Sequence, residues 1–112
     1  MFGVLNDTDA ARKLFGALPC SSIANTWGDE VYFGVPVDVE LEADAQQVVP
    51  PGTICLWVEG RSVAIPFGPT PVSRGDECRL VTKVNLLGRI EGDPRALKSV
   101  RVGDRIRIEA VP

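Results

Sequence analysis

Nine residues, "NTWGDEVYF" (25–33), concentrate rings and carboxylates in a chain that is only 6% aromatic. Successive side chains of an extended segment point to opposite faces, so Glu30 and Tyr32 share one face and Phe33 takes the other. We therefore expect Phe33 to face the core, and Trp27 and Tyr32 to face a groove. Such rings would wall an apolar ligand site, in which Glu30 fixes the ligand's orientation. Two structural roles stay open: packing of Trp27 against a later loop, and a hydrogen bond from a neighbouring backbone N–H to Glu30.

The residue inventory offers little for catalysis. The chain has no histidine, so neither a Ser–His nor a Cys–His nucleophile pair can be built. Asp29 and Glu30 are adjacent and point to opposite faces, which makes them a poor acid–base pair. Cys20, Cys55 and Cys78 are widely spaced and match neither a zinc site nor a disulfide framework. We predict no catalytic residue, no metal and no cofactor.

Several predicted elements surround these candidates. Apolar residues at helical spacing predict a helix over about 8–17, with polar caps before it and Pro19 after it. Alternating patterns then predict six or more short, mostly antiparallel strands, including a hairpin within 53–67 and a long strand that bends near Gly88. Asp93 before a proline predicts a second short helix. This count favours a β-barrel or sandwich plugged by helices.

Three blocks in this order resemble a known family. They are "NTWGDEVYFGVPV" with "GTICLW" after it, "FGPTPVS" and "VNLLGRI". The chain resembles the small bacterial and archaeal cyclophilin-like proteins of uncharacterised function. The resemblance implies one mainly β domain over 1–112, a closed cyclophilin-like barrel of about seven to eight strands with two short helices capping the ends.

The resemblance also adds ligand-site candidates from its later blocks. Together with Trp27, Glu30 and Tyr32, they are Phe67, Thr70, Pro71, Ser73 and Asn85. An amide within an apolar strand needs a partner if it is buried, so Asn85 fits either a ligand contact or a structural bond to a loop. Ser73 leaves the same two possibilities.

Charge and length bear on partners and location. Net charge is −3, which does not suggest nucleic-acid binding. Residues 1–56 carry −6 and residues 57–112 carry +3, which fits contacts within one barrel or contacts between copies. Family members usually begin with a further strand; without it the barrel would have a bare edge, so we expect a homo-oligomer or a truncated gene start. No apolar stretch approaches the ~20 residues of a membrane span and no signal segment begins the chain, so we expect a cytoplasmic protein.

The leading hypothesis is a non-catalytic module that binds a small molecule or a short peptide. One alternative is peptidyl-prolyl isomerisation, the activity of true cyclophilins, with Arg61 or Arg74 as the donor to the peptide carbonyl. The phenylalanine–histidine–arginine motif associated with that activity is absent. The other alternative is an interaction or regulatory subunit, because related folds occur in allophanate-hydrolysing enzymes and in kinase-inhibitor proteins.

Overall fold

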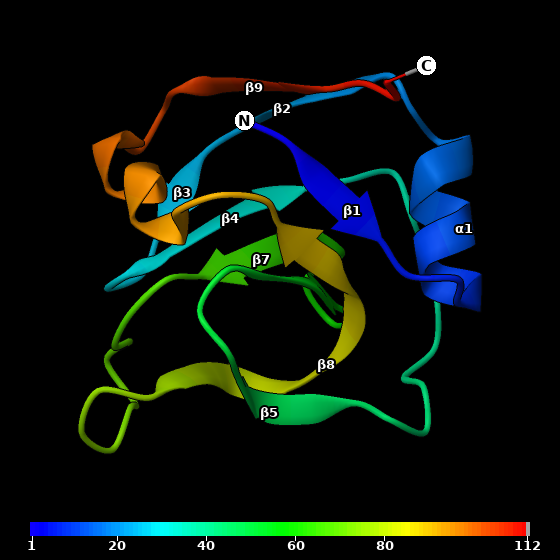
Figure 1. Ribbon diagram of the computed structural model, residues 1–112. Coiled ribbons are helices and arrows are strands. Elements are labelled where there is room, and N and C mark those ends of the chain that lie inside the picture. The colour runs from blue at the N-terminus through cyan, green and yellow to red at the C-terminus, as the bar shows by residue number, and fades with distance from the viewer. Residues whose placement is uncertain (112) are drawn as a thin grey trace.

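The computed structural model describes residues 1–111, which form nine strands and two short helices (Figure 1). The strands are β1 (Gly3–Leu5), β2 (Cys20–Ile23), β3 (Asn25–Thr26), β4 (Glu30–Gly34), β5 (Gln46–Val49), β6 (Thr53–Trp57), β7 (Ser62–Pro66), β8 (Cys78–Ile90) and β9 (Arg105–Ile108). The helices are α1 (Asp9–Gly16) and the 3-10 helix η1 (Pro94–Ser99). The mainly β class is confirmed, and the strand count exceeds the predicted seven to eight.

The strands pair into two antiparallel sheets. The larger has the order β1-β8-β6-β7-β4-β3, with β5 added along β8, and the smaller pairs β2 with β9. No pairing between the described residues joins β1 to β3, so these pairings do not by themselves close the sheet into a barrel. The strand β8 links the layers because its first half pairs with β5 and its second half pairs with β6 and β1.

Gly88 accounts for the close approach of β1 to β8. The register between β6 and β8 shifts next to it, which confirms the predicted irregularity. A Cβ atom at Gly88 would lie 2.0 Å from the carbonyl oxygen of Val4, a distance that no side chain tolerates. The absence of a side chain here lets β1 pair directly over the strand.

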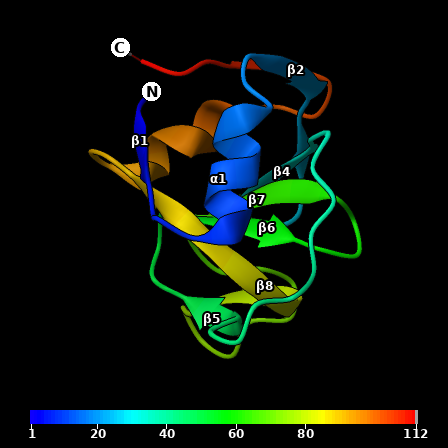
Figure 2. The same cartoon turned by 90° about the vertical axis from the view of Figure 1, so that its right-hand side faces the viewer.

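Both predicted helices are present. The Thr8 hydroxyl caps α1 by accepting a hydrogen bond from the backbone N–H of Ala11 at 3.2 Å. Asp93 caps η1 by accepting from the N–H of Arg95 at 3.0 Å. The two helices lie at opposite sides of the strands (Figure 1 and Figure 2). Neither has the length and apolar character that a helix needs to cross a membrane, and no other helix occurs in residues 1–111.

Alternation along β4, β7 and β6 divides the apolar residues into two clusters. We call the larger one the main core; its buried strand residues include Val31, Phe33, Ile54, Leu56, Val63 and Ile65. The smaller one, the second cluster, contains Val49, Cys55, Ala64, Cys78, Leu80 and Val84. The main core is covered by α1 and by the β2–β9 sheet, whereas the second cluster is covered by β5 and the first half of β8 (Figure 1). The strands β4, β7 and β6 therefore form a middle layer that is buried on both faces.

Candidate ligand pocket

The tryptophan turn, residues 27–29, lies beside the proline loop, residues 67–73, so Trp27 is close to a later loop as one of the open alternatives required. The backbone N–H of Asp29 donates to the carbonyl of Pro69 at 2.9 Å, and that of Phe67 donates to the carbonyl of Asp29 at 2.8 Å. Gly28 has φ +59°, and a Cβ atom there would lie 3.0 Å from both Pro69 O and Pro71 Cδ. Only a glycine lets the two backbones approach this closely, and this contact fixes the turn that carries Trp27.

A cavity of about 200 Å³ opens on the face of the middle layer that bears the second cluster. Its lining residues are Trp27, Glu30, Tyr32, Trp57, Ala64, Leu80, Val81 and Val84. Trp27, Glu30 and Tyr32 are three of the predicted site residues, and the structure brings them together here. Phe33 points to the other face and is buried in the main core, as predicted.

Trp57 is the main lining residue that the sequence analysis did not assign to the site. Its ring meets that of Tyr32 edge to face, with centroids 6.2 Å apart and an interplanar angle of 86°. Gly60 leaves the space that the Trp57 ring occupies, because a Cβ atom at this glycine would lie 2.2–2.7 Å from three ring atoms. The alternation in "TICLW" is the signal that identifies it, since Trp57 falls on the opposite face from the core residue Leu56.

Glu30 is the one charged residue among those that line the cavity. It is 5% exposed, and its Oε1 atom has no hydrogen-bond partner within residues 1–111. Burial raises the pKa of this carboxyl to about 7, because the ionised form loses hydration that nothing replaces. No neighbouring backbone N–H donates a hydrogen bond to Oε1, so the structural alternative for Glu30 does not apply to this atom.

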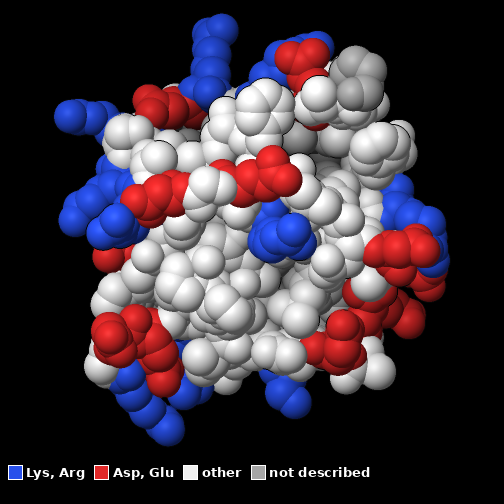
Figure 3. Space-filling model, in the orientation of Figure 1, with Lys and Arg blue, Asp and Glu red and all other residues white. Residues whose placement is uncertain are grey.

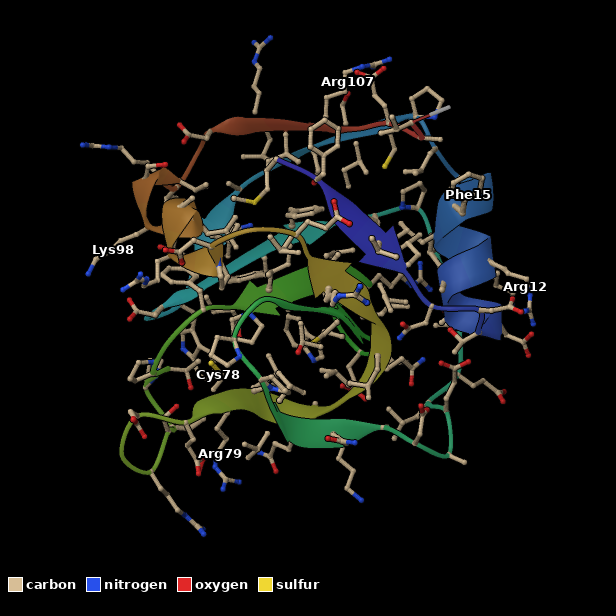
Figure 4. All side chains as sticks on the ribbon, viewed as in Figure 1. Arg12, Phe15, Cys78, Arg79, Lys98 and Arg107 are labelled. Carbon is tan, nitrogen blue, oxygen red and sulfur yellow. The ribbon has the colours of Figure 1, made fainter. Side chains whose placement is uncertain are left out.

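Two buried thiols lie near this carboxyl. Burial raises the pKa of Cys55, and the charges of Glu30 and Cys78 add to the effect. Burial likewise raises the pKa of Cys78, together with nearby carboxylates. Figure 4 shows Cys78 pointing inward from β8 and its neighbour Arg79 pointing away. Because only a thiolate attacks or binds a metal well, these cysteines act as small apolar residues.

Two predicted residues of the proline loop serve the loop itself. The hydroxyl of Thr70 donates to the carbonyl of Arg79, and its N–H donates to the Ser73 hydroxyl at 2.9 Å. Ser73 in turn donates to the carbonyl of Glu77 at 2.6 Å. These bonds use the polar atoms of both side chains to fold the segment back onto β8, so they support the loop that Gly28 contacts.

The other predicted residues lie away from the cavity. Phe67 packs against the main core, and Pro71 is exposed beside the tryptophan turn. Asn85 is fully buried on the core face of β8, where its Oδ1 accepts from the N–H of Glu42 at 2.7 Å and its Nδ2 donates to the carbonyl of Glu40 at 2.9 Å. This amide ties a loop to the sheet, which is the structural alternative left open by the sequence.

The arginines considered for isomerisation are also outside the cavity lining. Arg61 is exposed in the turn between β6 and β7 and forms an ion pair with Asp38 at 3.4 Å. Arg74 is exposed in the segment before β8. Within residues 1–111, no three histidine, cysteine, aspartate or glutamate residues are grouped in a way that could hold a metal ion. The cavity therefore offers three aromatic rings, aliphatic walls and one carboxyl group.

Comparison with known proteins agrees with the fold. The chain matches the family model described as Cyclophilin-like over residues 1–109. A solved structure with 35% sequence identity, the solution structure of a hypothetical protein from Archaeoglobus fulgidus, superimposes with a TM-score of 0.79 over 96% of this chain and 83% of that chain. No curated protein matches. The chain belongs to the Cyclophilin-like family.

Proposed function

We propose that this protein is a non-catalytic binding module whose cavity takes a small molecule. The observation that carries the proposal is the buried Glu30 carboxyl, whose Oε1 is unpartnered within residues 1–111 and lies in a space walled by three rings. A buried polar atom normally has a partner, and a few such groups in an apolar pocket are what orient a ligand. A bound ligand would supply the missing partner.

Cavity size favours a small molecule over a peptide segment. The volume of about 200 Å³ lies below the roughly 300–1,000 Å³ of pockets for drug-sized ligands. One ring or a branched alkyl group with one polar substituent fits this space. A short peptide would enter through one side chain only.

Three wider features belong to the same proposal. The strands form a closed cyclophilin-type barrel. In support of this, β8 pairs with β5 in its first half and with β1 in its second half, so one strand joins two parts of the barrel wall. The protein works in the cytoplasm. It works as a homo-oligomer. In support of this, Phe2 directly before the edge strand β1 and Val4 within it are exposed apolar residues. Light scattering tests the last feature, and a monomer at all concentrations would contradict it.

Binding can be tested by screening small aromatic and aliphatic compounds while recording the indole N–H signals of Trp27 and Trp57. We expect ligands that shift both signals to lose affinity in Ala64→Leu, because Ala64 lines the cavity and is 2% exposed. Ala43→Leu, at an exposed loop position, is the matched control and should bind normally. A screen in which no compound moves either indole signal would overturn the proposal.

A further inference from the structure

The charge of the cavity is unbalanced. Seven of its eight lining residues are uncharged, and the eighth is Glu30. A buried carboxylate without a partner is costly, because desolvation is not offset by a cation or by hydrogen-bond donors. Any bound group that carries a positive charge and an N–H donor would repay both losses at once. A bound anion would instead add a second negative charge beside the first.

The walls of the cavity favour the same kind of ligand. Trp27, Tyr32 and Trp57 present three aromatic rings, and Trp57 and Tyr32 are fixed edge to face. Cations are attracted to the faces of aromatic rings at distances up to about 6 Å, and this attraction grows when water is excluded. The aliphatic residues Leu80, Val81 and Val84 add apolar surface, so the remainder of the ligand is apolar.

We propose that the ligand is a small organic cation, whose ammonium group binds the Glu30 carboxylate beside the aromatic rings of the cavity and whose apolar body packs against the aliphatic wall. This inference rests on the proposed function, since it names the class of molecule that the cavity binds. The volume of about 200 Å³ limits the ligand to a single ring or a short chain.

Other titratable groups near Glu30 do not change this charge balance near neutral pH. Cys55 on β6 and Cys78 on β8 are thiols whose pKa burial raises, so they stay neutral. The paired strand β7 and the neighbouring β3 contain no titratable residue. Asp29 lies against Gly68, where a Cβ atom would meet its Oδ2 at 2.5 Å, and it does not line the cavity.

The test uses three probes of one shape: benzylammonium, benzyl alcohol and benzoate. Each is titrated into the whole protein at about pH 6 and about pH 8, with the two indole signals and calorimetry as readouts. At the higher pH we expect benzylammonium to bind at least about tenfold more tightly than benzyl alcohol, and benzoate most weakly. At the lower pH benzylammonium should bind up to about tenfold more weakly, because Glu30 is then largely protonated.

Variants separate the carboxyl from the rings. Glu30→Gln should remove the preference for benzylammonium and its pH dependence while keeping benzyl alcohol binding, which also reports that the variant is folded. Glu91→Gln, an exposed acid outside the cavity lining, is the matched control and should change neither. Trp57→Leu retains the carboxyl and should weaken benzylammonium binding several-fold through the lost ring.

The outcomes distinguish the two proposals. If benzyl alcohol or benzoate binds as tightly as benzylammonium at both pH values, the cation inference is overturned while the binding function stands. Unchanged benzylammonium binding in Glu30→Gln has the same meaning. If none of the three probes shifts either indole signal, the cation inference fails, and the compound screen then decides the binding function separately.

Discussion

The two faces of the middle layer differ although the same strands form both. On the core face, Phe33, Leu56 and Val63 are each at most 5% exposed and belong to one continuous cluster. On the other face, Tyr32 and Ala64 occupy the alternate positions and line a cavity. Alternate residues of one strand therefore pack in the main core and line the candidate site. On β4 and β7 the odd-numbered residues face the core, and on β6 the even-numbered residues do.

Residue size explains why the pocket face leaves room for a cavity. On the pocket face the centre of the layer carries Ala64 and Cys55, which are small, whereas the rings of Tyr32 and Trp57 stand beside them. The covering strand β8 is long and curved, and its pairing passes from β5 to β6 along its length (Figure 1). Large side chains around small ones leave a space between them. Glu30 is the one charged residue that lines the cavity on the pocket face.

Surface charge shows the same separation of uncharged and charged regions. In the orientation of Figure 1, uncharged residues cover a broad area below the centre of the visible face, although Lys or Arg atoms lie near the centre itself, and charged side chains of both signs lie around the edge (Figure 3). Several of these charges are already paired, such as Arg12 with Asp7 and Asp9. Exposed pairs of this kind contribute little stability. Substitutions on the two faces of the middle layer should therefore change stability more than substitutions of these surface charges.

The largest expected effect is on the core face. Leu56→Ala should lower the free energy of unfolding by about 4 kcal/mol, because it opens a cavity where the side chain is 1% exposed. Val81→Ala, at the rim of the pocket and 53% exposed, is the comparison and should cost less than about 1 kcal/mol. Chemical denaturation measures both. Equal losses would mean that the two faces are packed alike.

The second effect concerns Glu30 and has the opposite sign. With its pKa raised to about 7, folded Glu30 keeps a proton that the unfolded chain releases between about pH 4 and about pH 7. The unfolded state then binds fewer protons, so this group makes stability fall as pH rises through that window, and the full penalty applies above it. Glu30→Gln should therefore be more stable than the parent by about 3 kcal/mol near pH 8 and about equal to it near pH 4.

Thermal or chemical unfolding across this pH range measures the difference between the two profiles. Glu91→Gln, an exposed acid, should leave the profile of the parent unchanged. Parallel profiles for Glu30→Gln and the parent would show that Glu30 is not desolvated in the folded protein.

The third effect tests the assignment of Asn85 to the core face. Asn85→Ala leaves the N–H of Glu42 and the carbonyl of Glu40 without their partner, so it should cost about 2 kcal/mol. Because the amide points away from the cavity, binding of any pocket ligand should change little. Hydrogen exchange at Glu42 should accelerate. A large loss of ligand affinity with normal stability would instead return Asn85 to the ligand site.

Local alternation explains which site residues the sequence could identify. Glu30 and Tyr32 lie on β4, where period-two spacing separates them from Phe33, and Trp27 lies in the turn directly before that strand. Asn85 was assigned through a resemblance between blocks, and its neighbour Val84 is the residue that lines the cavity. A shift of one position on a strand reverses the face, so block similarity without strand parity cannot make that distinction.

Long-range geometry explains why the sequence does not identify the lining residues on β8. Leu80, Val81 and Val84 reach the cavity only because β8 folds back over the layer, and nothing in their own alternation specifies that path. The helix over Asp9–Gly16 and the turn at Asp93 were predictable because caps and helical spacing act within a few residues. The cavity depends on which layer covers which face, which is a tertiary property.

The smallest expected effect reaches the pocket through a glycine that lines no part of it. Gly60→Ala places a Cβ atom within 2.2–2.7 Å of the Trp57 ring, so the ring must move away from its edge-to-face contact with Tyr32, at a cost of about 1 kcal/mol. Gly34→Ala is the matched control, because a Cβ atom there has nothing within 4 Å. The indole signal of Trp57 should shift in the first variant and not in the second, and affinity for a pocket ligand should fall with it. If the Trp57 signal stays in place in Gly60→Ala, the turn does not fix that wall of the cavity, and the rigidity that separates the pocket face from an ordinary exposed surface must come from Tyr32 alone.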